Sequence, residues 1–454
     1  MTSLSLIQGY IIGYFIIIYG IGFFKKSNSD KNSFIFAGRK LTLPAFVATL
    51  VSTWYGGILE VGRFSYENGI VTWLVFGVFY YFAAICFSYF LVPKIINGKI
   101  QSIPGLIHKT SGKTAGLIAV LLILLLTSPA PYLKIFTVII RSVWDLPEFA
   151  ILTAGITMSV FYALKGGFSS IVRTDKLQFI LMFTGFGMML WHLVSNYGGY
   201  EFLISNVPAN LLEIPGNIPW TTIFAWGFIA MVTFIDPGFF QRSFAGTTLK
   251  TVKKGIGFSI LFWILFDFMT VTTGLYAAAI LPESHSTPYI DLAQIVLSPL
   301  AQTIFIISLL AIVMSTIDSF TFISAYTIGM DLSTILKTEI DDQAIYTNTR
   351  IGLVLTAFIA VGLSLFFNNA VEMWYMVGSL AVPVLMVPVL SGLYGIKLDR
   401  PLLQMMLPLF VTLCWFFIGF LNQDKGGYPQ YYFGLDPMYP GIGVSFVLFL
   451  MLRK

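Results

Sequence analysis

The chain has 454 residues, of which 57% are hydrophobic and only 10% are Asp, Glu, Lys or Arg. Soluble domains carry charge on about 25% of their residues because their surfaces face water. This composition nearly excludes a soluble protein and fits a chain whose surface mostly faces lipid. A span needs about 20 apolar residues, so a dozen or so spans would leave few residues for any domain outside the membrane.

Long apolar runs, and the breaks between them, predict thirteen membrane-spanning helices. The runs are continuous, whereas the strands of a membrane barrel alternate over about 10 residues. The first run has no basic region before it and no small-residue cleavage site after it, so a retained span is predicted and not a signal peptide. The predicted limits are 5–24, 42–68, 69–93, 113–143, 147–167, 171–197, 220–246, 254–281, 299–332, 348–369, 371–397, 402–421 and 438–452.

The positions of the basic residues support this number of spans. With the N-terminus outside and the sides alternating, all but four of the 26 Lys and Arg residues fall in inner segments. Arg242 is counted with these inner residues. One missed or invented helix would scramble this bias downstream. We therefore predict an integral protein of the plasma (cell inner) membrane with its N-terminus outside and its C-terminus cytoplasmic. The four exceptions are Arg63, Lys134, Arg141 and Lys425.

Many helices without a large soluble domain indicate transport. A sensor would normally carry a signalling module, and an integral membrane enzyme would usually show clustered His or acidic residues at one membrane face. We therefore predict that the protein is not an enzyme. Cys86 and Cys414 both lie in apolar stretches and the three histidines are scattered, so neither a disulfide framework nor a zinc site is expected.

Two of the predicted helices are interrupted near the middle of the membrane. The helix 42–68 contains Gly56-Gly57, and the helix 220–246 contains Asp236-Pro237-Gly238. Paired glycines weaken a helix by about 1 kcal/mol each relative to alanine, and proline removes a backbone donor. The breaks are five helices apart, and an odd repeat length inverts the second half. Transporters built from inverted repeats bind their ligands between two such broken helices.

The helix 299–332 carries the richest polar face. Ser315, Asp318 and Ser319 stand at i, i+3 and i+4, which places them on one side of the helix. Hydroxyls, backbone carbonyls and a carboxylate are hard oxygen ligands of the kind that a small alkali cation needs. The alternative is that the hydroxyls bond back to the helix backbone. This alternative explains the serines but leaves Asp318 costly, because a charge at the bilayer centre costs about 2.5–3.5 kcal/mol on insertion scales.

Other charges inside the predicted spans have structural interpretations as well. Glu60 and Arg63 are spaced for a bridge at i, i+3 near the outer surface. Asp267 fits a buried structural partner, and Asp175 could cap its helix near the inner interface. Each of these charges is otherwise expected to face the interior of the bundle and to find a partner there.

Around the polar residues of the helices 171–197 and 299–332, the sequence resembles the sodium:solute symporter family. The strongest match is YALKGGFSSIVRTDKLQ, Tyr162 to Gln178, which is similar to the family's Gly-Gly…Thr-Asp…Gln signature. The resemblance spans about 36 to 332. It implies an all-α polytopic membrane protein with a leucine-transporter-like fold, in which two inverted five-helix repeats follow one extra helix and precede two more. Further matches are Phe240–Gly246, Met314–Ser319 with Met330-Asp331, Phe36–Lys40 and Ser102–Pro104.

The resemblance divides the chain into five parts. These are an N-terminal helix and cytoplasmic loop (1–40), a first five-helix repeat (41–197), an extracytoplasmic loop (198–219), a second five-helix repeat (220–397) and two C-terminal helices (398–454).

The resemblance also implies a sodium site between the helices 42–68 and 299–332. Its ligands would be the backbone carbonyls of Ser52, Tyr55 and Ile312 and the hydroxyls of Ser315 and Thr316. Some family members have a second ion site nearer the cytoplasm. In this chain it would involve Asp175, Asp318 and Ser319 together with Ser315. Two acids at this site would favour a second sodium ion, or a proton held on one acid by like-charge repulsion.

The solute is expected beside the two breaks. In sugar-transporting relatives the turn of the first broken helix supplies polar residues, so Ile58 and Leu59 at those positions speak against a sugar. Lys134 could hold a solute carboxylate or form an ion pair with Asp236 or Glu60, and the sequence leaves both open. The predicted solute contacts are Trp54, Gly56, Gly57, Ile58, Leu59, Tyr80, Tyr132, Lys134, Phe234, Asp236 and Tyr375.

The predicted function is sodium-coupled import of a small organic solute by alternating access, with a carboxylate or amino-acid-like solute favoured over a sugar. The alternatives are a proton-coupled transporter of the same fold, which would use Asp175 or Asp318, and a solute receptor that does not transport. The expected partners are the solute, sodium as the coupling ion and membrane lipid. No cofactor, other metal or nucleic acid is expected, and the chain is expected to function as a monomer.

Overall fold

Helices form nearly all of the regular structure in the computed structural model, which describes residues 3–24, 27, 30–281, 285–337, 340–366, 370–423 and 429–454. The first half contains α1 (Ser3–Phe23), α2 (Lys31–Phe36), α3 (Leu43–Trp54), α4 (Ile58–Asn68), α5 (Val71–Trp73), α6 (Phe79–Cys86), α7 (Val92–Asn97), α8 (Ile103–Ser111), α9 (Lys113–Leu126), α10 (Ala130–Arg141), α11 (Glu148–Gly166) and α12 (Phe168–Tyr197). The second half contains α13 (Tyr200–Asn206), α14 (Trp220–Ile229), α15 (Pro237–Ala245), α16 (Leu249–Ile280), α17 (Pro288–Val296), α18 (Pro299–Tyr326), α19 (Ser333–Leu336), α20 (Asp342–Phe366), α21 (Ala370–Tyr394), α22 (Pro401–Leu421) and α23 (Met438–Leu452).

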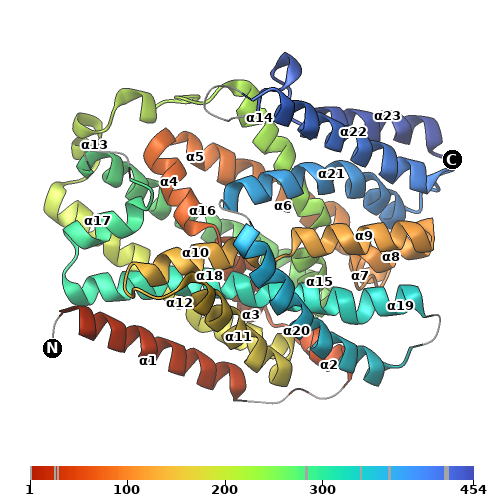
Figure 1. Cartoon of the computed structure of the whole chain (residues 1–454), viewed down its shortest axis with the longest axis horizontal. Helices are drawn as coiled ribbons and strands as arrows, with labels where there is room; N and C mark the ends of the chain where they lie inside the picture. Colours follow the sequence, from red (N-terminus) through yellow and green to blue (C-terminus); the bar gives the residue numbers. More distant parts are fainter. Residues whose placement is uncertain are drawn as a thin grey trace.

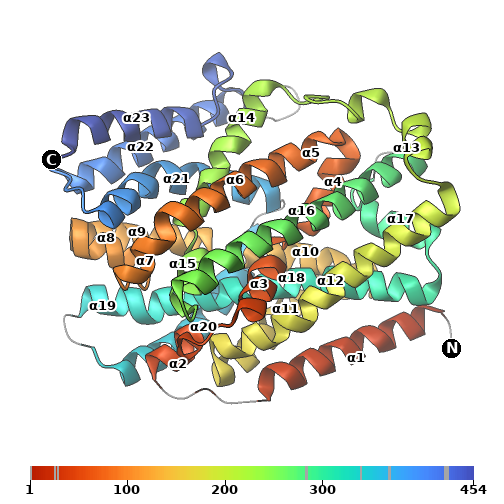
Figure 2. The same ribbon diagram turned by 180° about the vertical axis from the view of Figure 1, so that it is seen from behind.

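Each of the thirteen predicted spans has a helical counterpart. Within the described residues, 11 helical segments are long and apolar enough to cross a membrane, and the bent pair of α3 and α4 makes a twelfth. The thirteenth, α23, is also apolar but has only 15 residues. The long helices run along a common direction, and the two termini lie at opposite ends of the bundle, as an odd number of spans requires (Figures 1 and 2).

Some helix limits differ from the prediction because charged residues extend the helices beyond their apolar runs. The helix α16 begins at Leu249, five residues before the predicted start, and includes three lysines in its first turns. The Thr248 hydroxyl accepts a hydrogen bond from the backbone N–H of Thr251 at 3.1 Å and caps this helix. Similarly, α20 begins at Asp342 and not at 348. Hydropathy locates the buried part of such a helix and not its polar ends.

The helix α18 occupies the centre of the bundle, and α1 and the pair α22 and α23 lie at its two edges (Figures 1 and 2). In the most apolar 18-residue stretch of each span, 78% of the residues are buried for α18 and 28% for α1. The helices α3, α10, α12 and α20 pack against α18. Its polar side chains are therefore shielded from both water and lipid, and their partners have to come from these neighbours.

The first predicted break is present between α3 and α4, which meet at an angle of 59°. Glycine is required here by close approach. A Cβ atom on Gly56 would lie 2.5 Å from the Tyr132 ring and 2.6 Å from Thr316, and one on Gly57 would lie 2.2 Å from the Trp374 ring. Two large rings therefore pack directly against the backbone of the break.

The second predicted break is present between α14 and α15. The helical path tightens to a 3₁₀ segment at Ala230–Ile235 and then stops at Asp236. Pro237 begins α15, a position where its missing N–H costs nothing. The Asp236 carboxylate accepts a hydrogen bond from the Phe239 N–H at 2.8 Å and so caps the new helix. Asp236, which the sequence analysis placed in the break, thus also caps the helix that follows it.

Candidate ion and solute sites

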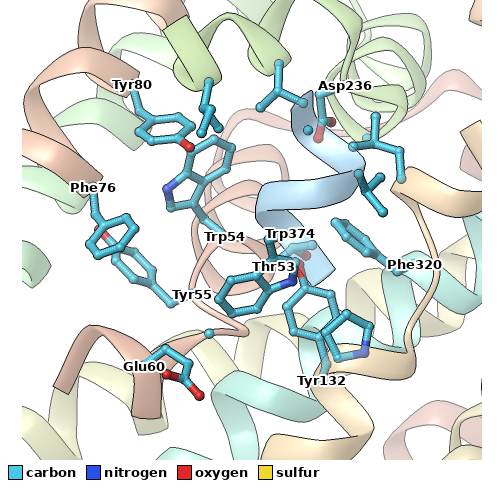
Figure 3. A pocket seen from close by; sticks show the side chains of 18 of the residues that line it. Thr53, Trp54, Tyr55, Glu60, Phe76, Tyr80, Tyr132, Asp236, Phe320 and Trp374 are labelled. Carbon is cyan, nitrogen blue, oxygen red and sulfur yellow. The ribbon is translucent and has the colours of Figure 1, made fainter. Parts of the chain in front are cut away.

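A cavity of about 210 Å³ lies between the two broken helices (Figure 3). Its walls are mainly aromatic and aliphatic, and its ionisable members are three acids and one arginine. A small, mostly apolar cavity with a few convergent polar groups is typical of a small-molecule site. The aromatic residues of its lining are Trp54, Tyr55, Phe76, Tyr80, Tyr132, Trp226, Phe239, Phe320 and Trp374.

Five of the predicted solute contacts line this cavity, namely Trp54, Gly57, Tyr80, Tyr132 and Asp236. The remaining six are not part of its lining. Ile58 and Leu59 are buried where α4 packs on its neighbours. Phe234 lies in the 3₁₀ segment before the second break, and Tyr375 donates its hydroxyl to Asp436 at 2.5 Å. The other two are Gly56 and Lys134.

Lys134 is committed to an ion pair that the sequence analysis did not name. Its Nζ lies 2.5 Å from Oε1 of Glu148. The two expected alternative partners were wrong, because Asp236 caps α15 and Glu60 forms the predicted i, i+3 bridge with Arg63, at 2.9 Å. Lys134 is therefore not part of the cavity lining, and its ammonium group is paired with Glu148.

The residues of the predicted sodium site lie where α3 ends beside the middle of α18. The Ser315 hydroxyl is 2.8 Å from Ser52 Oγ, and the Thr316 hydroxyl donates to the Thr53 carbonyl at 2.8 Å and to the Ile312 carbonyl at 3.3 Å. The last carbonyls of a helix have no partner within that helix, and α3 ends at Trp54. Buried hydroxyl and carbonyl oxygens of two helices therefore converge at this point.

A buried arginine completes this polar cluster. Arg242 is only 1% exposed, so its assignment to the inner-side loop cations was wrong. Its Nη2 lies 2.9 Å from Thr53 Oγ1, 3.0 Å from Ser319 Oγ and 3.1 Å from Thr49 Oγ1. Thr49 in turn donates its hydroxyl to the Asp175 carboxylate. The guanidinium therefore joins α15 to α3, α12 and α18.

Asp175 belongs to this cluster and does not cap its helix. It stands well inside α12, which begins at Phe168, and is fully buried. Its Oδ1 accepts a hydrogen bond from Ser315 at 2.7 Å, in addition to the bond from Thr49. Its negative charge lies in the field of Arg242. Asp175 is thus satisfied on both oxygens by the residues around it.

Asp318 lies in a different environment from Asp175 and Ser319. Neither of its carboxylate oxygens has a hydrogen-bond partner among the described residues, although the side chain is fully buried. Ser159, Tyr162 and Gln178 face it without reaching hydrogen-bond geometry. Tyr14 on α1 is close to Gln178 and is also without a partner. The three residues predicted to share the second ion site are therefore divided between two polar clusters.

Asp267 on α16 has the structural partners that were expected for it. Tyr55 donates its hydroxyl to Oδ1 at 2.8 Å, and Tyr81 donates its hydroxyl to Oδ2. The tryptophan Trp73 donates its ring N–H to the Tyr81 oxygen at 3.2 Å. Asp267 also lines the cavity, so it is both held by the protein and accessible to a solute.

Several members of the two sites were not named from the sequence: Thr49, Thr53, Tyr81, Arg242 and Trp374. Part of the signal was present. Thr49, Ser52 and Thr53 stand at i, i+3 and i+4, which is the same spacing that singled out the polar face of α18. Tyr81 and Trp374 carry no comparable local signal, because their roles depend on packing between distant helices.

The fold resembles two solved transporter structures. A sodium-coupled sialic acid symporter, solved in a substrate-bound outward-open state, superimposes with a TM-score of 0.81 at 11% identity and covers 100% of this chain and 99% of that chain. Mhp1, a nucleobase-cation-symport-1 family transporter solved in a closed conformation with bromovinylhydantoin bound, superimposes with a TM-score of 0.59 at 11% identity, over 94% and 96% of the two chains. The chain therefore has the leucine-transporter-type fold that was predicted.

The sequence profile of the Sodium:solute symporter family matches residues 34–401, and the chain belongs to this family. The sodium/proline symporter of Staphylococcus aureus (strain Newman) is 22% identical over 97% of this chain and 91% of its own length. Zebrafish sodium/glucose cotransporter 4 is 22% identical over 60% of this chain and 46% of its own length, and the proline transporter PutP of Bacillus subtilis is 24% identical over 47% of each. The chain thus spans about half the length of the zebrafish and Bacillus relatives that it matches.

Proposed function

We propose that this protein is a sodium-coupled symporter that imports a small organic solute across the plasma membrane by alternating access. Its N-terminus would lie outside and its C-terminus in the cytoplasm, with the two five-helix repeats at 41–197 and 220–397. The observation that carries the proposal is the convergence of buried oxygens from the end of α3 and the middle of α18, directly beside the cavity between the two broken helices.

The coupling ion in this proposal is sodium, bound by the carbonyls of Ser52, Tyr55 and Ile312 and the hydroxyls of Ser315 and Thr316. In the structure these two hydroxyls bond to α3 itself, at 2.8 Å in each case. A sodium ion would take over these oxygens and hold α3 and α18 together through its own charge. Because the ion binds one arrangement of the two helices better than the other, it would shift the population toward the outward-open state.

A second ion is proposed at Asp318. A buried carboxylate without a partner is costly, and a bound cation or a proton would relieve that cost. The surrounding oxygens of Ser159, Tyr162 and Gln178 are hard ligands and carry no net charge. Asp175 and Ser319 were expected in the same site, but their bonds to Ser315 and Arg242 leave them less available.

The solute is proposed to be amino-acid-like or a small carboxylate and not a sugar. A sugar needs several hydrogen-bond partners for its hydroxyls, because buried polar groups are costly when they are left unpaired. The cavity offers mainly rings and aliphatic side chains. Sodium/proline and sodium/glucose transporters both occur among the relatives, so their names alone do not decide between the two classes.

The sodium assignment is tested by replacing Ser315 and Thr316 together by alanine. The full chain in proteoliposomes, with an inward sodium gradient, should accumulate a labelled solute from a panel that includes proline and glucose, and the double variant should not. In detergent, sodium should raise the melting temperature of the wild type relative to potassium, and this effect should be absent in the variant. Unchanged sodium dependence in the variant would refute the site.

The matched control is Ser308→Ala. Ser308 is also on α18 and fully buried, but it bonds back to the Phe305 carbonyl at 2.7 Å. Ser308 is two turns from Ser315 but only one turn from Ile312, and it supplies none of the proposed ligands, so this variant should keep the full sodium effect. Uptake driven by a pH gradient without sodium would select the proton-coupled alternative, and solute binding without accumulation under any gradient would select a receptor.

A further inference from the structure

We propose that the Asp267 carboxylate is the anchor of the solute and that the solute presents an ammonium group to it, either protonated or quaternary. This inference rests on the proposed function, because it assumes that the cavity between the broken helices is the solute site. It adds which group of the solute is recognised, and it names a residue on α16 that the sequence analysis had assigned only a structural role.

Asp267 is held in position as a binding group would be. The hydroxyls of Tyr55 and Tyr81 donate to its two different oxygens, and the ring N–H of Trp73 fixes Tyr81. These bonds orient the carboxylate, since both hydroxyls act as donors. Each oxygen still has acceptor capacity left for a second donor. Asp267 is 5% exposed and is part of the cavity lining.

The charges around the cavity leave Asp267 without a counter-ion from the protein. Of the other two acids in the lining, Glu60 is paired with Arg63 at 2.9 Å and Asp236 lies in the field of Arg242. No ion pair to Asp267 occurs within the described part of the chain. A buried carboxylate without an opposite charge is strongly disfavoured. A cationic group on the solute would supply that charge.

A solute carboxylate would find one basic residue among the described lining residues, and that residue already faces two acids of the protein, Asp175 and Asp236. Arg242 is the basic residue among the lining residues; its Nη2 is bonded to Thr49, Thr53 and Ser319, whereas its Nε–H has no hydrogen-bond partner among the described residues. Lys134 is held by Glu148 outside the cavity. The ammonium group of a zwitterion would therefore meet an acid that has no counter-ion, whereas its carboxylate would have to compete with Asp175 and Asp236 for Arg242.

The aromatic wall beside Asp267 fits the same class of ligand. The Trp54 and Tyr80 rings are 5.2 Å apart at 76°, and the Tyr55 ring packs on Phe266 at 4.6 Å. Figure 3 shows Trp54, Tyr55, Phe76 and Tyr80 around one side of the cavity. The faces of such rings attract cations, and this attraction does not require the cation to donate hydrogen bonds. A methylated ammonium would thus be accepted as well as a protonated amine.

The experiment compares ammonium compounds with carbon compounds of the same shape. Binding to the purified full-length chain in detergent is measured by thermal shift and calorimetry in sodium buffer. The pairs are choline with 3,3-dimethylbutan-1-ol, and glycine betaine with 3,3-dimethylbutanoate. Within each pair only the charged nitrogen is replaced by carbon. We expect at least one ammonium compound to bind about tenfold or more tightly than its carbon counterpart, which is the range of a desolvated cation–π and ion-pair contact.

The variant Asp267→Asn tests the residue, because asparagine keeps the size and can still accept from a tyrosine hydroxyl. It should abolish the preference for the ammonium compounds and leave the sodium-induced thermal shift intact. The control is Asp331→Asn, a second buried aspartate that accepts from Ser102 at 2.5 Å outside the cavity. It should keep the preference.

The outcomes separate this inference from the proposed function. Equal binding within both pairs, no binding of either ammonium compound, or the same preference in Asp267→Asn as in the wild type would overturn the inference. The first two of these need no variant, so they decide even if Asp267→Asn does not fold. Ammonium-selective binding without sodium-driven accumulation in proteoliposomes would uphold the anchor and refute the symporter. Sodium-driven accumulation of a neutral or anionic solute would uphold the symporter and refute the anchor.

Discussion

The guanidinium of Arg242 and the carboxylate of Asp175 should stabilise the protein as a coupled unit, linked through Thr49. The single variant Arg242→Met removes the hydrogen bonds to Thr49, Thr53 and Ser319 and leaves Asp175 buried without its counter-charge. Breaking a buried charge pair by removing one partner costs about 3–5 kcal/mol. Asp175→Asn should cost less, about 1–3 kcal/mol, because asparagine keeps an acceptor for Ser315 and Asp236 still faces Arg242.

The informative measurement is the double-mutant cycle. The double variant removes both charges, so it should cost less than the sum of the single variants by about 0.5–3 kcal/mol. The free energy of unfolding can be measured in detergent micelles by titration with sodium dodecyl sulfate and tryptophan fluorescence. The control cycle combines Arg242→Met with Asp436→Asn, since Asp436 accepts from Tyr375 and shares no hydrogen-bond partner with Arg242. That pair should be additive within about 0.3–0.5 kcal/mol. Additivity in the first cycle would refute the link through Thr49.

Three further predictions concern the cavity and its surroundings. Gly57→Ala places a methyl group 2.2 Å from the Trp374 ring, so the ring must shift. The free energy of unfolding should fall by about 1–3 kcal/mol, and the KM of uptake should rise. An unchanged KM would show that the break between α3 and α4 does not contact the solute. Lys134→Met and Glu148→Gln should each change the free energy of unfolding by about 1 kcal/mol or less and leave solute affinity unchanged. A lower solute affinity in Lys134→Met alone would show that Lys134 contacts the solute. Asp318→Asn should lower the Hill coefficient of the sodium dependence from about two to about one, and an unchanged coefficient would exclude a second sodium ion at this acid.

The fold was accessible from the sequence because lipid imposes simple rules. A span has to be helical and about 20 residues long, so hydropathy was enough to find a helix for each of the thirteen predicted spans, although the last of them, α23, has only 15 residues. The two breaks were also visible, since glycine pairs and Asp-Pro-Gly interrupt a helix by local chemistry. The limits of α16 and α20 were missed because polar residues continue these helices beyond the lipid-facing segment.

The candidate sites were accessible only where their residues are close in sequence. The face of α18 could be identified because Ser315, Asp318 and Ser319 are neighbours on one helix. The partner of Lys134 could not be identified, since Glu148 lies in the next helix and the sequence analysis considered only Asp236 and Glu60. Likewise, the division of Asp175 and Asp318 between two clusters depends on which neighbouring helix each side chain meets.

The geometry gives one residue a direct part in both the ion site and the solute site. Tyr55 is the C-cap residue directly after α3; its carbonyl is a proposed sodium ligand, and its hydroxyl donates to Asp267 at 2.8 Å. A sodium ion that fixes this carbonyl also fixes the orientation of the ring, and with it the carboxylate that would meet the solute. The two ligands should therefore bind with positive coupling, and by linkage each should raise the affinity of the other by the same factor.

Tyr55→Phe isolates this connection because it keeps the carbonyl and removes only the hydroxyl. We expect sodium to stabilise the variant as it stabilises the wild type, while the ratio of solute affinities with and without sodium falls toward one. Binding titrations in sodium and in potassium buffer measure that ratio. The matched control is Tyr289→Phe, which removes a buried hydroxyl bonded to the Thr270 carbonyl at 2.7 Å and should leave the ratio unchanged. If Tyr55→Phe weakens solute binding equally in both buffers, the hydroxyl supports the solute site but does not couple it to sodium.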